Sequence, residues 1–416
     1  MANEDRTAWR IAIAVFISLF FIWGVGYDCF PIFLPSFLKA FHLNKEQAGW
    51  LPGAQALTAG VFGLLVGWLL DRVRAEIVMA VGAVLTAIGI GVMAAAGSFG
   101  VLIFGSVISG IGMSASTILP ATMIVSNWFG ERRGTALGVT TAGMETGGMV
   151  ITAAAGLLIV AVGWRYAYAL LALPLVVIVF PLTLIAVRTR PQTAGVAKAG
   201  DDGPNAEYAA STLPGLEVNE AVRTRAFWML VVFQFCYTFT VGGVFFHLVQ
   251  YLLNIGYDRT IGTLVISVSL GMALIGKPSL GLLGDRIGGK NALGWCILVG
   301  AANTIFLLTA RTHWALAVFT LISGITGAAP IALGPMVQVE TMGLKRYGSI
   351  MGLLGIAFTL GAAMGPPTVG WLADLNGGSY VLAFEVCILI GLVGAAAAFL
   401  CVAPARTPIA ALAEAE

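Results

Sequence analysis

The chain places four ionisable side chains inside long apolar stretches. Lys277 lies in ALIGKPSLGLLGDR, Glu145 in GMETGG, Asp28 in GYDCFP and His247 in VFFHLVQ. A charge near the centre of a membrane costs about 2.5–3.5 kcal/mol on insertion scales, so such groups usually face a cavity or a partner. An ammonium can bind a carboxylate there, whereas a buried acid can bind a cation or carry a proton. These residues are therefore the first candidates for a binding site.

Lys277 directly precedes Pro278, which lacks a backbone N–H and can open the helix locally. One interpretation is that its ammonium anchors the carboxylate of a solute. The structural alternatives are an ion pair with an acid, or a long side chain that extends to the membrane edge.

Glu145 lies about 11 residues into its apolar segment, or about 17 Å along a helix, close to the middle of a membrane. The small residues around it let helices approach or leave space for a ligand. Asp28 lies shortly before two prolines. Each acid can bind a substrate cation, carry a coupled proton or pair with Lys277, and the sequence leaves these roles open. His247 titrates near neutral pH, so it is a candidate proton relay or a packing residue with one hydrogen bond.

Composition indicates which elements hold these groups. The chain has 416 residues, of which 59% are hydrophobic and 10% charged, whereas a soluble domain has about 25% charged residues. Segments of about 20 apolar residues span a bilayer as helices, because lipid offers the backbone no hydrogen-bond partners. Twelve such spans are predicted, at residues 9–38, 47–70, 76–97, 100–126, 134–160, 164–187, 227–254, 260–283, 291–310, 313–341, 347–373 and 379–402.

The distribution of basic residues predicts the orientation. With both termini on one side, that side holds 16 of the 22 Lys and Arg residues, the other side holds five, and Lys277 lies within a span. The positive-inside rule then places both termini in the cytoplasm. Residues 188–226 are rich in Pro, Gly and mixed charge, so we expect a cytoplasmic linker with a short surface helix near 215–225.

The sequence also repeats itself. Three separated sets of residues recur at an offset of about 214, which indicates two related halves in tandem. We therefore expect an N-terminal six-helix bundle at 1–187, the linker at 188–226 and a C-terminal six-helix bundle at 227–416. The repeated glycine and Asp-Arg pairs are Gly67, Asp71 and Arg72, and Gly281, Asp285 and Arg286.

These repeated motifs lie at the predicted cytoplasmic edge. A glycine four residues before the acid allows a tight helix approach, and an acid next to an arginine can pair with a neighbouring helix end. We predict that both motifs are latches that hold an outward-open state and release during the inward switch. Arg132 and Arg133 are expected to join this charge cluster or to contact anionic lipid.

The repeated stretches GWLLDRVRAE and GLLGDRIGGK resemble the cytoplasmic motif of the major facilitator superfamily. The stretches YDCFPIFLPSFLKAFHLNKEQAGWLPGA and SNWFGERRGTALGVTTAG are similar to its monocarboxylate-transporter and oxalate/formate branch. The resemblance implies an all-α membrane protein with twelve transmembrane helices in two pseudo-symmetric bundles, placed in a bacterial inner membrane. It also implies a cation at the position of Lys277. Within the spans, Tyr27, Phe33, Leu119 and Phe358 are further candidates for lining a cavity.

The chain departs from this branch at two points. It has Lys277 where the family commonly has an arginine, so the bidentate fork that holds a carboxylate is lost. It also has Asp28 and Glu145 where a carrier of simple monoanions is expected to be apolar. These departures speak against transport of a plain lactate-like anion.

The function expected from this resemblance is secondary active transport of a small organic carboxylate, monocarboxylate-like or zwitterionic, by proton symport and alternating access. A drug or organic-cation antiporter is the alternative, because Asp28 and Glu145 suit a cation, although GVTTAGMETGGMV lacks the Gly-Pro pair common in such antiporters. A carboxylate exchanger also remains open.

Other classes are disfavoured. We expect no enzyme, cofactor or metal, because the chain has no phosphate loop, GxSxG or zinc-ligand spacing, and its five cysteines lie in apolar runs. A net charge of +2 does not suggest nucleic acid. The expected partners are a small organic acid, a coupled proton and the lipid bilayer, and the chain is expected to be a monomer because it contains both halves.

Overall fold

The computed structural model describes residues 2–129, 132–189 and 215–401. Within these residues, twelve helical segments are long and apolar enough to cross a membrane. They confirm the twelve predicted spans: Arg6–Phe41, Lys45–Leu70, Ala75–Ala94, Phe99–Trp128, Arg133–Val162, Trp164–Ala186, Arg225–Asn254, Arg259–Ile287, Gly289–Leu308, His313–Met342, Tyr347–Leu375 and Val381–Phe399.

Three of the first six spans are not single α-helices. Span 1 consists of α1 (Ala2–Trp23), a π-helical turn η1 (Gly24–Asp28) and α2 (Phe30–Phe41). The other spans of this half are formed by α3 (Lys45–Leu70), α4 (Ala75–Ala94), α5 (Phe99–Ser116) with α6 (Ile118–Trp128), α7 (Arg133–Val162), and α8 (Trp164–Pro174) with η2 (Leu175–Val179) and α9 (Phe180–Ala186). Pro31 accounts for the break in span 1, because it lacks the backbone N–H needed for the preceding helical register and is accommodated at the start of α2.

The second half begins with the short helix α11 (Val218–Ala221), within the predicted surface helix. Its spans are α12 (Arg225–Asn254), α13 (Arg259–Ile287), α14 (Gly289–Leu308), α15 (His313–Gly327) with α16 (Ala329–Met342), α17 (Tyr347–Leu375) and α18 (Val381–Phe399).

The chain folds into two compact units. One contains residues 1–199 together with 245–271, and the other contains residues 200–244 together with 272–416. The first unit therefore includes the end of α12 and the beginning of α13, which the sequence prediction assigned to the C-terminal bundle.

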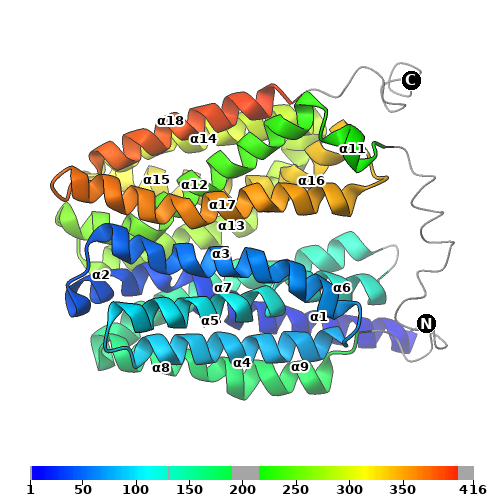
Figure 1. The fold of residues 1–416 in the computed structure, drawn as a ribbon, viewed down its shortest axis with the longest axis horizontal. Coiled ribbons are helices and arrows are strands. Elements are labelled where there is room, and N and C mark those ends of the chain that lie inside the picture. Colours follow the sequence, from blue (N-terminus) through cyan, green and yellow to red (C-terminus); the bar gives the residue numbers. More distant parts are fainter. Residues whose placement is uncertain (1, 130–131, 190–214, 402–416) are drawn as a thin grey trace. The chain divides into compact units, whose positions relative to one another are not determined.

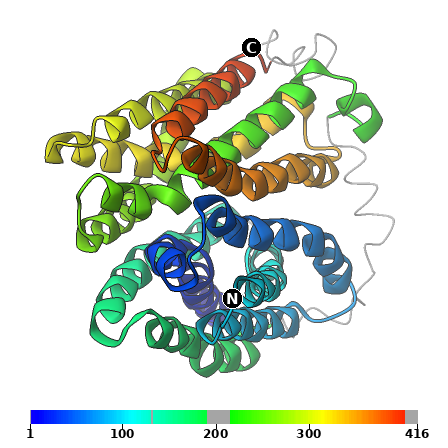
Figure 2. The same cartoon turned by 60° about the vertical axis from the view of Figure 1, so that its left-hand side comes forward.

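Glycines let the helices of the first unit pack backbone against backbone. α4 and α5 lie side by side (Figures 1 and 2). A Cβ on Gly89 of α4 would lie 2.6 Å from the carbonyl oxygen of Gly105 in α5. α1 packs against α7 in the same way, because a Cβ on Gly147 would overlap the carbonyl oxygen of Phe20. Small residues at helix contacts are typical of membrane bundles.

The second unit has an equivalent backbone contact at a glycine. Gly361 of α17 lies 214 positions after Gly147, and a Cβ there would overlap the carbonyl oxygen of Phe235 in α12. The repeat found in the sequence thus corresponds to an equivalent helix contact in each half. Around it, α12, α14, α16, α17 and α18 bury a core that includes Phe233, Leu293 and Leu333.

Candidate functional site

The π-helical turn of span 1 leaves one backbone carbonyl without a backbone donor from its own helix. The amide of Cys29 donates to the carbonyl of Gly24, five residues earlier, at 3.1 Å. In that register the carbonyl of Gly26 would need the amide of residue 31, which is a proline and has none. The side chain of Gln55 donates to this carbonyl instead, at 2.7 Å. π-Helical turns inside α-helices frequently mark functional sites.

Gln55 joins three spans at this point. Its side chain is buried, and its amide also lies 2.9 Å from the hydroxyl of Ser109 and 3.3 Å from the sulfur of Met113, both in α5. The π turn is therefore held in position by α3 and α5. Gln55 is not among the residues predicted from the sequence, although a glutamine inside an apolar span is a visible signal.

Asp28 ends the π turn and lies against α7. Only 2% of Asp28 and 8% of Glu145 are exposed. A Cβ on Gly148 would overlap the Oδ2 atom of Asp28, so this carboxyl sits directly on the α7 backbone. Glu145 lies three residues before Gly148, on the same face of the helix, and its carboxyl interacts electrostatically with that of Asp28. The structure thus brings together two of the predicted site residues.

Aromatic rings surround the π turn. Tyr27 contacts Trp23, with ring centroids 5.2 Å apart, and Phe246 of α12, with centroids 5.1 Å apart. Phe30 also contacts Phe246 at 5.7 Å. His247 follows Phe246 and is fully buried. Tyr27 and His247 therefore belong to the same unit as Asp28 and Glu145.

A polar contact also joins α13 to span 1. The guanidinium of Arg259 donates to the hydroxyl of Ser36 at 3.1 Å, and Thr263 packs against Gly156 of α7. The beginning of α13 therefore packs on spans 1 and 5.

Lys277 belongs to the second unit. The helix α13 continues through Pro278 to Ile287, so the proline does not interrupt the span. The lysine is partly buried, and its Nζ atom itself is inaccessible to solvent. A charged group buried within a span usually faces a cavity or a partner.

The other lining candidates differ in environment. Phe33 is fully buried and stacks on Tyr168 with ring centroids 4.2 Å apart, so it packs inside the first unit. Leu119 and Phe358 are each 44% exposed.

The repeated Asp-Arg motifs are exposed. Asp71, Arg72, Asp285 and Arg286 all lie on the surface, as do Arg132 and Arg133. The guanidinium of Arg72 stacks on the ring of Trp68 at 4.0 Å and donates to its carbonyl at 3.2 Å.

Within each unit, the described residues show no tight helix approach at the motif glycines. A Cβ on Gly67 or Gly281 would meet no atom within 4 Å. Arg72 folds back on its own helix.

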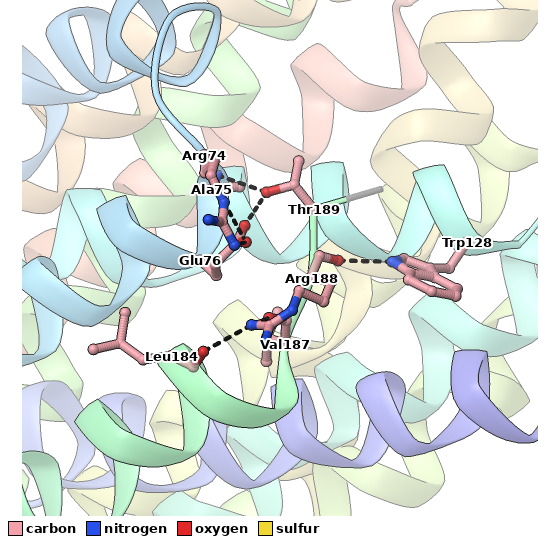
Figure 3. Close-up of polar contacts among 8 residues, drawn as sticks. All are labelled: Arg74, Ala75, Glu76, Trp128, Leu184, Val187, Arg188 and Thr189. Carbon is pink, nitrogen blue, oxygen red and sulfur yellow. Dashed lines mark hydrogen bonds and ion pairs between the residues drawn. The ribbon is translucent and has the colours of Figure 1, made fainter. Parts of the chain in front are cut away.

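A polar network that the sequence analysis missed lies at the same end of the first unit (Figure 3). Arg74 forms an ion pair with the buried Glu76, which also accepts a hydrogen bond from the hydroxyl of Thr189. That hydroxyl accepts the amide of Ala75 at 2.9 Å. Thr189, which follows span 6, thereby caps the start of α4. The network begins three residues after Asp71, at the start of α4.

Two further contacts fix the segment after span 6. The indole of Trp128, at the end of α6, donates to the carbonyl of Arg188 at 2.7 Å (Figure 3). The Arg188 guanidinium donates to the carbonyl of Leu184 at 2.8 Å. The start of the predicted linker is therefore docked on the first unit.

The end of the linker is docked on the second unit. Leu216 donates its amide to the carbonyl of Met342 at 2.9 Å. The carboxylate of Glu217 lies 3.0 Å from Arg346 Nε and 3.2 Å from Lys345 Nζ, and these hydrogen bonds lower the pKa of Glu217. Gly215 has a φ of +156° and lies against the backbone of residues 342–345, where a Cβ would be crowded.

Among the described residues, no group of three or more His, Cys, Asp and Glu side chains is arranged to hold a metal ion. The chemistry that the arrangement offers is therefore charge pairing and proton binding: an ammonium in α13 of the second unit, and two acids, a histidine and a tyrosine in the first.

Comparison with known proteins places these features in a family. The model of the Major Facilitator Superfamily matches residues 11–302 and 255–416. The chain is 22% identical to the MFS transporter asaE of Aspergillus flavus, over 90% of this chain and 82% of that protein. It is 25% identical to Monocarboxylate transporter 13 of Bos taurus, over 91% of this chain and 85% of that protein.

A solved structure has the same fold. It is the crystal structure of a bacterial homolog of the human lysosomal transporter Spinster in an inward-facing and unoccupied conformation, with a TM-score of 0.75, 16% identity and 96% coverage of both chains. The twelve spans, the repeated helix contacts and the match of the family model along the chain lead to one conclusion: this protein is an integral, multi-pass membrane protein that belongs to the major facilitator superfamily of transporters.

Proposed function

We propose that this transporter carries a small organic carboxylate, monocarboxylate-like or zwitterionic, together with a proton. The observation that carries the proposal is Lys277, a lysine within a span whose Nζ atom is buried. A cation in such a place is costly unless it serves a binding or pairing role. The similarity to a protein named Monocarboxylate transporter 13 supports an anionic cargo.

The working cycle is alternating access by the two repeated halves, residues 1–187 and 227–416. The proposed orientation has both termini in the cytoplasm of a bacterial cell, which the excess of basic residues on that side supports. Lys277 binds the cargo carboxylate, and Asp28, Glu145 and His247 are the groups that handle the proton.

The test of Lys277 uses purified protein in liposomes with a panel of labelled monocarboxylates and amino acids. Lys277→Ala should abolish saturable uptake, because the carboxylate loses its counter-charge. Lys277→Arg should retain part of it, because the positive charge stays. Lys39→Ala, at an exposed lysine, is the matched control and should transport normally. Full activity of Lys277→Ala would refute the assignment.

Asp28 and Glu145 support a second candidate, a proton-coupled antiporter of a drug or organic cation. Two buried acids in one unit are a suitable site for a cationic solute. The same liposomes distinguish the two candidates. For an antiporter, a proton gradient that is higher inside the liposome should drive uptake of an organic cation. Asp28→Asn should reduce that uptake, whereas Lys277→Ala should not.

A further inference from the structure

The two acids of the first unit lie in one place but come from different spans. Asp28 is at the end of the π turn in span 1, and Glu145 is in α7 of span 5. The carboxyl of Asp28 rests on Gly148, one turn from Glu145, and the two carboxyls interact electrostatically. Their proximity depends on glycines: Gly147 and Gly24 let α1 and α7 touch through their backbones.

The partners of Asp28 leave one of its oxygens without a hydrogen bond. The side chain of Trp23 interacts favourably with the carboxyl, but Oδ2 is buried and has no hydrogen-bond partner among the described residues. A buried polar atom in this state costs free energy unless a proton, water or ligand supplies the missing bond. Two neighbouring carboxylates, one resting a single helical turn from the other, add like-charge repulsion, which is strong where water is excluded.

We infer that Asp28 and Glu145 act as one site that holds a single shared proton. The proton changes the charge of the pair from −2 to −1, removes the like-charge repulsion and gives the unpartnered oxygen of Asp28 a bond. The role in transport rests on the proposed function: the pair accepts one proton from water on one side of the membrane and releases it on the other. The coupled proton then has one binding site, formed by residues of spans 1 and 5.

The other groups packed around the pair do not supply this proton site. Tyr27 and Cys29 flank Asp28, and the Cys29 thiol donates to the carbonyl of Val25 at 3.1 Å. From α3 and α5 come the neutral Gln55 and Ser109. From α12 comes His247, the residue after Phe246, which contacts Tyr27. Glu145 is therefore the acid that faces Asp28 within this unit.

Infrared spectroscopy of the purified protein in lipid nanodiscs at neutral pH tests the inference. The measured quantity is the C=O band of neutral carboxyl groups. Asp28→Asn and Glu145→Gln should each remove the amplitude of one neutral carboxyl, because an amide N–H replaces the shared proton and leaves the other acid as a carboxylate. The double variant should lose no more than either single variant.

Every other outcome overturns the inference. If the double variant loses two carboxyls, each acid holds its own proton. If one single variant loses the band and the other does not, one acid holds it alone. If no variant changes the band, the pair holds no proton.

Glu76→Gln is the matched control, since Glu76 is equally buried but is paired with Arg74, and the band should not change. Should Asp28→Asn fail to fold, Asp28→Ser, which keeps a hydroxyl donor, takes its place. The measurement needs no substrate, so its failure would refute the shared proton and leave the proposed transport to be judged by uptake.

Discussion

The contact between spans 1 and 5 should tolerate no side chain at Gly147. In Gly147→Ala the added methyl overlaps the backbone carbonyl of Phe20, which cannot rotate away as a side chain could, so α1 has to shift. Overpacking of this kind costs about 1–3 kcal/mol. Gly138→Ala in the same helix meets no atom within 4 Å and serves as the control. Both variants gain the same helix propensity, about 0.5–1 kcal/mol, so this gain cancels and the control should be more stable by about 1–3 kcal/mol.

The assay is unfolding in mixed micelles by added denaturing detergent. Accessibility of the five cysteines provides the signal, because all five are buried in the folded protein and react with a thiol dye only after unfolding. Because α1 positions Asp28 against α7, Gly147→Ala should also weaken proton-coupled uptake. Equal unfolding midpoints for the two alanine variants would refute the backbone contact.

Two further predictions concern residues that the sequence analysis missed. Gln55→Leu should destabilise the protein by about 1–2 kcal/mol, because the carbonyl of Gly26 loses its donor; the same unfolding assay measures this, and an unchanged midpoint would contradict it. Glu217 has a lowered pKa in the folded protein, so the stability that its contacts provide is present above its unfolded pKa, about 4.3, and is lost as the pH falls through the lower folded pKa. Hydrogen exchange at residues 215–222 should therefore be faster on strong acidification, relative to the intrinsic exchange rate of an unfolded peptide at the same pH. In Glu217→Gln it should already be fast at neutral pH, and slow exchange in that variant would refute the role of the carboxylate.

Hydropathy and charge predict the spans well because the bilayer constrains both strongly. Each of the twelve predicted segments overlaps a helix of membrane length, with most ends within a few residues. The repeat predicted from Gly67 and Gly281 is confirmed elsewhere, by the equivalent contacts of Gly147 and Gly361. Pro31 is visible in the sequence, but the π register just before it depends on how Gln55 reaches the Gly26 carbonyl.

The site is harder to predict, because it depends on how each helix is rotated about its axis. The sequence identifies Asp28 and Glu145 as costly residues, but their proximity follows from the way Gly24, Gly147 and Gly148 meet across two spans. The Asp71 motif has a strong sequence signal, yet the structure places the polar network at Glu76 and Thr189. Such contacts join residues more than a hundred positions apart, and no local pattern encodes them.

The proposed function is tested most directly by gradient-driven accumulation. Liposomes containing the purified protein are given an inwardly directed proton gradient, and the internal concentrations of labelled carboxylates are followed with and without a protonophore. Proton symport predicts that one or more small carboxylates accumulate above the external concentration and that the protonophore abolishes this accumulation. Uptake that ignores the gradient and requires counter-substrate inside the liposomes would contradict symport and establish exchange.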